Sequence, residues 1–164
     1  MSKQHATQSP TRSSTVPESI KAASGFWFTA VGAGAFEAGL AVTDMLADGT
    51  ASLADLAAGL GLRLTIFAMA IFMAVRLRQG ANWARIGLAL TLGVFGTLSL
   101  VIEPVRWLLE GHALGQAIAD ADAMTFVFAA SRIVHLAAVL TAMVLMFTPT
   151  ANTHFRARPR LSHV

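Results

Sequence analysis

The sequence contains no cysteine. This absence excludes disulfide bonds, cysteine-ligated zinc, iron–sulfur clusters and thiol catalysis. Charge is also scarce, because only 13 % of the 164 residues are Asp, Glu, Lys or Arg, whereas a soluble domain averages about 25 %. So few charges cannot cover a water-facing surface, and 55 % of the residues are hydrophobic. The composition therefore argues against a soluble protein.

The apolar residues are concentrated in four segments, at about 20–42, 52–75, 83–103 and 123–147. Each is close to the ~20 residues that a helix needs to cross the hydrocarbon core of a membrane. The first segment is too long for the apolar region of a signal peptide and is interrupted by Glu37. We therefore expect an all-α membrane protein whose four transmembrane helices form an up-down antiparallel bundle over residues 19–149.

The segments outside the bundle are polar. Residues 1–18 are rich in Ser, Thr, Gln and Pro, a composition that predicts a disordered tail. Residues 150–164 form a short basic tail. The segment 110–122 contains Gly, Ala and acidic residues and is expected to be a loop.

Several residues mark the expected helix ends. Ser52 and Asp55 fit a capping box at the start of the second helix. Asn82 is the expected N-cap of the third helix. Pro104 is expected to end or kink that helix, which would leave Val105–Leu109 as an interfacial turn or short helix.

The basic residues predict an orientation, because Lys and Arg accumulate on the cytoplasmic side of membrane spans. Nine of the twelve fall on one side of the four-span arrangement: Lys3, Arg12, Lys21, Arg76, Arg78, Arg85, Arg156, Arg158 and Arg160. The other side carries one basic residue, Arg106, and seven acidic ones: Asp44, Asp48, Asp55, Glu103, Glu110, Asp120 and Asp122. We therefore expect both termini in the cytoplasm and the chain in the plasma membrane.

Two features bear on how the helices meet the membrane and each other. Trp27, Trp83 and Trp107 lie near span ends and are interpreted as interfacial anchors. Small residues recur every four positions as Ala30, Gly34 and Ala38, and as Ala89, Gly93 and Thr97. Such stripes allow close helix packing. They fit contacts within one bundle and the formation of an oligomer equally well.

Four ionisable residues fall within the spans: Glu37, Arg63, Arg132 and His135. A charge at the centre of a span costs ~2.5–3.5 kcal/mol on insertion scales, so such residues usually face the bundle interior and pair. At ~1.5 Å per residue, all four lie in the outer half of the bundle. We predict a polar cluster in which Glu37 pairs with Arg63 or Arg132.

Glu103 and Arg106 would form the rim of this cluster. Two arginines for one deep carboxylate leave positive charge that would suit an anionic ligand, a lipid headgroup or water. The competing interpretation is a structural ion pair that fixes helix register. Arg63 and Arg132 are also close enough to the outer interface for their side chains to extend to it.

Two segments at the expected cytoplasmic edge resemble elements of small actinobacterial four-helix membrane proteins. One runs from Arg78 to Arg85 and matches an R-x-G-x-N-W-A-R turn; the other runs from Phe147 to Arg156 and matches P-x-A-N-x-Y-F-R, with His154 in place of Tyr. The resemblance implies the four-span fold and a membrane location, and carries no activity. The residues of these segments singled out as an edge motif are Gly80, Asn82, Trp83, Arg85, Pro149, Asn152 and Phe155. They are expected to dock together.

The sequence favours a non-enzymatic protein. It has no phosphate-binding loop, no H-E-x-x-H, no G-x-S-x-G and no paired acidic metal motif. His135 is the only histidine within a span, which argues against a bis-histidine haem. We expect no cofactor or metal. The net charge of +3 comes from residues at segment edges, so nucleic acid is not an expected partner.

Two function classes remain. The first is a structural, accessory or assembly component of the membrane, as a homo-oligomer or with a partner membrane protein. The alternative is a small transporter, channel subunit or ligand sensor that uses the polar cluster. A membrane enzyme is a distant third, since no nucleophile or metal set converges on that cluster. Membrane lipids are the expected immediate partners in every case.

Overall fold

The computed structural model describes residues 16–47, 49 and 52–157, and every regular element in these residues is helical. The elements are α1 (Glu18–Ala47), α2 (Leu53–Arg78), α3 (Asn82–Leu88), the π-helix η1 (Ala89–Gly96), α4 (Thr97–Leu109), α5 (Leu114–Ala119), α6 (Ala123–Met146) and α7 (Pro149–Ala157). Most of the predicted N-terminal tail, the last basic residues and Asp48 lie outside the described residues.

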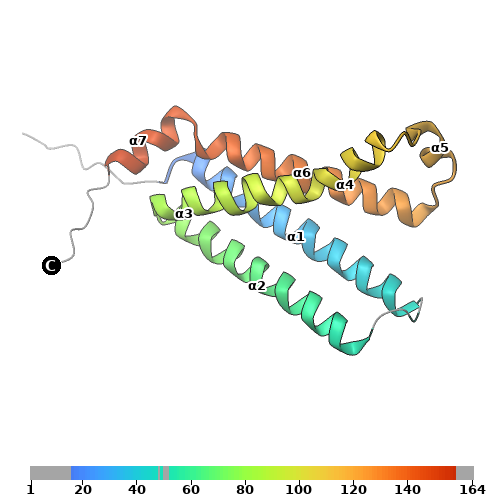
Figure 1. The fold of residues 1–164 in the computed structure, drawn as a ribbon. Coiled ribbons are helices and arrows are strands. Elements are labelled where there is room, and N and C mark those ends of the chain that lie inside the picture. Colours follow the sequence, from blue (N-terminus) through green and yellow to red (C-terminus); the bar gives the residue numbers. More distant parts are fainter. Residues whose placement is uncertain (1–15, 48, 50–51, 158–164) are drawn as a thin grey trace, which may run out of the picture.

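Four helical segments are long and apolar enough to cross a membrane: Glu18–Ala47, Ala54–Arg78, Asn82–Leu109 and Ala123–Met146. All exceed the ~20 residues required, so the predicted all-α class is confirmed, with four helices long and apolar enough to span a membrane. The third combines α3, η1 and α4. The chain passes back and forth along the molecule (Figure 1). We call the two ends the α7 end, where α1 begins and α2 meets α3, and the α5 end.

The helices pack unevenly along their length. α1 lies against α6 over a long interface and also contacts α2. α2 packs against α3 at the α7 end, and the two spans then diverge toward the α5 end (Figure 1). Most of the fully buried side chains, including Ile20, Leu77, Leu88 and Met146, come from the part of the bundle near the α7 end. The half toward the α5 end is therefore more open.

The tryptophans do not all anchor at an interface. Trp27 is only 1 % exposed, and its indole N–H donates to the sulfur of Met146 at 3.4 Å. The interfacial interpretation of Trp27 is therefore wrong: it shares a helix face with Ile20 and Ala23, and that face packs inward. Trp83 is exposed and lies 6.0 Å from the ring of Phe72. Trp107 stacks on His112 at 4.9 Å.

The expected helix ends are partly confirmed. The Ser52 hydroxyl accepts from the backbone N–H of Asp55 at 3.2 Å and donates to its carboxylate at 2.6 Å, which confirms the cap of α2. The N-cap of α3 is Ala81, without a side-chain hydrogen bond, so the prediction for Asn82 is wrong by one residue. The α5 helix occupies part of the predicted loop.

Pro104 lies inside α4, which continues to Leu109. The expectation that Pro104 ends the third helix and leaves Val105–Leu109 separate is wrong. Proline removes one backbone donor, here the one that would reach the carbonyl of Leu100. Spans tolerate this loss where neighbouring groups and local adjustments satisfy the freed carbonyl. About two turns before Pro104, η1 interrupts the α-helical hydrogen bonding of the same span.

The small-residue stripes pack within the bundle. Ala30, Ala38 and Ala89 are each less than 9 % exposed. A Cβ atom on Gly93 would approach the sulfur of Met143 to 2.3 Å, so this glycine gives α6 room to pack against η1. Of the interpretations weighed for these stripes, contact inside one bundle is therefore supported.

Candidate functional site

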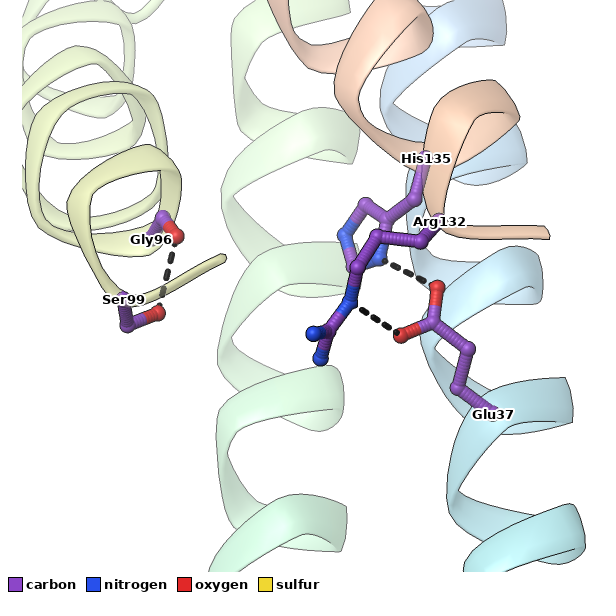
Figure 2. Close-up of polar contacts among 5 residues, drawn as sticks. All are labelled: Glu37, Gly96, Ser99, Arg132 and His135. Atoms are coloured by element: carbon purple, nitrogen blue, oxygen red, sulfur yellow. Dashed lines mark hydrogen bonds and ion pairs between the residues drawn. The ribbon is translucent and has the colours of Figure 1, made fainter. Parts of the chain in front are cut away.

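Glu37 is the centre of a buried polar cluster. Glu37 lies in α1 and is only 7 % exposed. One carboxylate oxygen lies 3.6 Å from Nε of Arg132 and the other lies 3.3 Å from Nδ1 of His135 (Figure 2). Arg132 and His135 lie three positions apart on α6 and so share one face. We call Glu37, Arg132 and His135 the triad.

Glycine on α1 makes room for the triad. A Cβ atom on Gly34 would lie 3.1 Å from Cε1 of His135 and 3.2 Å from Cε1 of Phe67. Gly34 and Glu37 are three residues apart, so they present a gap and a carboxylate on one helix face. The predicted pairing of Glu37 with an arginine is thus correct for Arg132. His135 is a second partner that approaches through the gap at Gly34.

The hydrogen bond to the Glu37 carboxylate selects one tautomer of a neutral His135. A carboxylate only accepts hydrogen bonds, so the bond to Glu37 requires the proton on Nδ1 of His135. The second nitrogen, Nε2, is then an acceptor in the neutral ring. It makes no hydrogen bond to any described residue, and Figure 2 shows it on the side of the ring that faces α4. Nε2 of His135 is therefore a hydrogen-bond acceptor that points away from Glu37 and Arg132.

Arg63 does not join this cluster. It is exposed on α2, and its guanidinium lies beside Gly59, 3.4 Å from the position of a Cβ atom there. It makes no ion pair with a described residue. The predicted excess of positive charge in the cluster is therefore wrong, because the rotation of α2 turns this side chain outward. The triad carries one carboxylate and one guanidinium, which compensate each other.

The predicted rim does not border the triad either. Arg106 forms an ion pair with Glu110 at 3.2 Å, and both side chains are at least half exposed. Glu103 is also exposed on α4. Neither Glu103 nor Arg106 lines the spaces next to the triad. Arg106 pairs with Glu110 because residues four apart on a helix are neighbours.

A cavity of about 340 Å³ lies between the spans beside His135. Its wall combines apolar side chains from α1, α2, η1, α4 and α6 with three polar groups, Thr91, Ser99 and His135; the apolar members include Trp27, Ala30, Val31, Ile66, Phe67, Leu92, Phe95, Leu100 and Val139. The Thr91 and Ser99 hydroxyls donate to backbone carbonyls of the preceding turn in the third span, at 2.7 and 2.8 Å. We call this space the central cavity.

The sequence carried little signal for the central cavity. Phe67, Phe95 and Ser99 occur in apolar runs that look alike on every face, so nothing distinguished cavity-lining from lipid-facing positions. The small residues and the mid-span histidine were the useful signals. The position of α2 relative to the third span depends on contacts between residues far apart in the sequence.

The edge motif assembles at the α7 end. The Arg85 guanidinium donates a hydrogen bond to the side-chain oxygen of Asn152. It also lies over two aromatic rings, 4.2 Å from the centroid of Phe147 and 5.1 Å from that of Phe155. Gly80 has a φ of 81°, which favours glycine, and makes the turn between α2 and α3. The two segments that resembled a family thus contact each other through Arg85.

Trp83 and Pro149 take other positions in this motif. Trp83 is on the exposed side of α3, and Pro149 is the first residue of α7. A first-turn position suits proline because its missing N–H would have no helical partner there. Within the part of the chain that the structure describes, no group of three or more metal-ligating side chains occurs.

Comparisons with family models, with curated proteins and with solved structures give no match to this chain. The four apolar helices fit a multi-pass integral membrane protein. Any more specific role must be argued from the triad and the spaces next to it.

Proposed function

We propose that this chain is a non-enzymatic membrane protein that binds a small membrane-dissolved molecule in the central cavity, as a sensor or carrier. The observation that carries the proposal is the position of His135. Its Nδ1 faces Glu37, and the same ring lines a cavity of about 340 Å³. Ligand sites are typically apolar hollows of this scale with a few polar groups that fix orientation.

The chemistry of the wall indicates the class of ligand. Most of the lining is aliphatic or aromatic, so the bulk of the ligand must be apolar. With Nδ1 held by Glu37, Nε2 of His135 accepts a hydrogen bond, which calls for a donor on the ligand. A hydroxyl on an apolar body meets both requirements. A neighbouring hollow between α2 and η1 shares Ile66, Thr91, Leu92 and Phe95 with the central cavity, and it gives such a molecule a path from the lipid.

The alternative is a structural or assembly role in which the triad only fixes helix register. The Glu37–Arg132 pair supports this reading, because buried ion pairs are used for register in other proteins. The structural role gives no reason for a cavity beside His135. The ligand-binding proposal accounts for both features and is therefore preferred. A homo-oligomer or a partner membrane protein is compatible with either role.

The orientation and location are part of the proposal. Basic residues gather at the α7 end and acidic residues at the α5 end, so we place the α7 end in the cytoplasm and the chain in the plasma membrane. The edge segments support membership of the small actinobacterial four-helix proteins that they resemble. Arg85, which joins the two segments, is then a structural residue of that group.

Photolabelling tests the proposal. The protein in lipid nanodiscs is labelled with a diazirine-bearing long-chain alcohol, and the sites are mapped by mass spectrometry. We expect saturable labelling of cavity residues, competed by dodecanol and not by its methyl ether, which cannot donate. His135→Leu should reduce labelling to the background that remains in excess dodecanol. Glu37→Gln should weaken the labelling.

A matched pair of variants provides the control. Ile66 and Ile71 lie on α2 with almost equal exposure, 41 % and 42 %, but only Ile66 lines the central cavity. Ile66→Trp should block labelling, whereas Ile71→Trp should leave it unchanged. Equal labelling of the wild type and both variants, or equal competition by alcohol and ether, would contradict the proposal.

A further inference from the structure

A second hollow of about 590 Å³ lies between α1 and α6, toward the α5 end. Its walls are apolar, with Leu40 from α1 and Phe128 from α6, and it also carries three charged residues: Asp44, Asp122 and Arg132. We call it the α1–α6 groove. It lies on the other side of the triad from the central cavity, since Arg132 lines the groove and His135 lines the cavity.

The guanidinium of Arg132 is only partly used by the triad. Its Nε lies 3.6 Å from Glu37, which is an ion pair but longer than a hydrogen bond. The side chain is 37 % exposed. Figure 2 shows its two terminal nitrogens pointing away from Glu37, toward the α5 end. They make no hydrogen bond to a described residue. Their N–H groups form a fork that suits a phosphate oxyanion.

Two carboxylates lie farther along the same groove. Asp44 is seven residues beyond Glu37, which places it about 10 Å closer to the α5 end. Asp122 is ten residues before Arg132, about 15 Å in the same direction. One oxygen of Asp122 accepts hydrogen bonds from the backbone N–H and the hydroxyl of Thr125, at 2.8 and 2.6 Å. The other oxygen and the carboxylate of Asp44 make no hydrogen bond to a described residue.

We propose that the α1–α6 groove binds the headgroup of a zwitterionic phospholipid that carries a primary ammonium, of the phosphoethanolamine type. The charges follow the order of such a headgroup: Arg132 lies deeper and the two carboxylates lie closer to the α5 end, as the phosphate and the ammonium of the lipid do. The apolar wall of Leu40 and Phe128 lies between them. Arg132 holds the phosphate, and Asp44 and Asp122 hold the ammonium. This inference does not rest on the proposed function of the central cavity.

The same charges discriminate against other headgroups. An anionic headgroup such as phosphoglycerol brings no cation, so Asp44 and Asp122 repel it. A choline headgroup has a cation without N–H donors and cannot donate hydrogen bonds to the carboxylates. The groove should therefore select among lipids that share a phosphate. This selection separates a built site from general contact with the bilayer.

Lipid retention measures this selection. The full-length protein is placed in nanodiscs with equal parts of phosphatidylethanolamine, phosphatidylcholine and phosphatidylglycerol, and retained lipids are counted by native mass spectrometry. We expect phosphatidylethanolamine to be enriched about fivefold over each of the others, the size of effect that a partly exposed pair of charges gives.

Charge-removing variants assign the contacts. In the Asp44→Asn, Asp122→Asn double variant the preference for phosphatidylethanolamine should disappear and retention of phosphatidylglycerol should rise. Asparagine remains a good N-cap at position 122, so α6 keeps its start. Arg132→Gln should lower retention of all three phospholipids. Arg63→Gln and Asp120→Asn remove like charges outside the groove and should change nothing.

Three results would overturn the inference. They are equal retention of the three lipids by the wild type, an unchanged preference in the Asp44→Asn, Asp122→Asn variant, or displacement of lipid by millimolar inorganic phosphate as effectively as by phosphoethanolamine. The last result would mark a phosphate site rather than a lipid site. If Arg132→Gln does not fold, the double aspartate variant still decides.

Discussion

Cε1 of His135 lies 3.1 Å from the point that a Cβ atom on Gly34 would occupy. Gly34→Ala therefore requires the imidazole to shift by a few tenths of an ångström, and the ring of Phe67, 3.2 Å from the same point, must also move. We expect a loss of about 1 kcal/mol in stability, typical of mild overpacking. Displacement of the ring should also reduce saturable labelling by the alcohol probe.

Gly32 is the matched control for this prediction. It lies on the same helix, and a Cβ atom there has no neighbour within 4 Å. Gly32→Ala should be neutral or stabilising by up to ~1 kcal/mol, because alanine has the higher helix propensity. Both variants are compared by SDS-induced unfolding in detergent micelles. The interpretation of Gly34 fails if its alanine variant is as stable, and labels as well, as Gly32→Ala.

Arg85 should be the most sensitive basic residue at the α7 end. It is 7 % exposed, bonded to Asn152 and stacked near Phe147 and Phe155. Arg85→Ala should cost about 2 kcal/mol, from one charged hydrogen bond and a desolvated cation–π contact. Arg85→Lys should recover only part of this, since the ammonium lacks the planar fork. Arg78→Ala, at an exposed site, should stay within about 0.5 kcal/mol.

Asp122 should show a pH dependence that identifies its cap. Hydrogen bonds from the Thr125 side chain and then its backbone lower the pKa of Asp122 below the ordinary 3.8. A carboxyl with a lowered folded-state pKa contributes stability that is complete above the unfolded value and is lost as pH falls through the folded value. Thr125→Val should raise the pKa, because only the backbone bond remains, whereas Thr125→Ser should preserve it.

Carbon-13 NMR titration of the Asp122 carboxyl gives this comparison directly. Identical titration of Asp122 in the wild type and in Thr125→Val would rule out the side-chain hydrogen bond as the main cause.

The absence of cysteine makes the orientation easy to test. Single cysteines at His112, near the α5 end, and at Thr150, in α7, report opposite ends of the bundle. If the α7 end is cytoplasmic, a membrane-impermeant maleimide should label the His112→Cys variant in intact cells. The Thr150→Cys variant should react only after permeabilisation. The reverse pattern would invert the assignment.

The sequence predicted the elements well because spans of this length and hydropathy have few alternatives. The cap at Ser52 was predicted from spacing. Glu37 was predicted to pair with Arg63 or Arg132, and the two edge segments were predicted to dock, without the specific contact of Arg85 with Asn152. Failures occurred where the direction of a side chain mattered. Trp27 and Arg63 lie in apolar runs that lack a polar face, so the sequence could not say that one turns inward and the other outward.

The two hollows could not be predicted for a related reason. They depend on the angle between α2 and the third span and on the seam between α1 and α6, and these arise from contacts far apart in the sequence. Helix propensity and hydropathy describe each span alone. Only the triad residues indicated a polar site between the spans.

The π-helix η1 has a consequence for how the third span can vary. An α-helix turns by about 100° per residue, whereas a π-helical turn takes up extra chain without adding an ordinary turn. Removal of one residue from Ala89–Gly96 would therefore restore α-helical winding and leave Ser99 and Leu100 facing nearly the same way. The same deletion in the regular helix α3 has no extra residue to absorb it, and it would rotate η1 and α4 together by about 100°. Ser99 and Leu100 would then turn away from His135, so the third span should tolerate a change of length in η1 and not in α3.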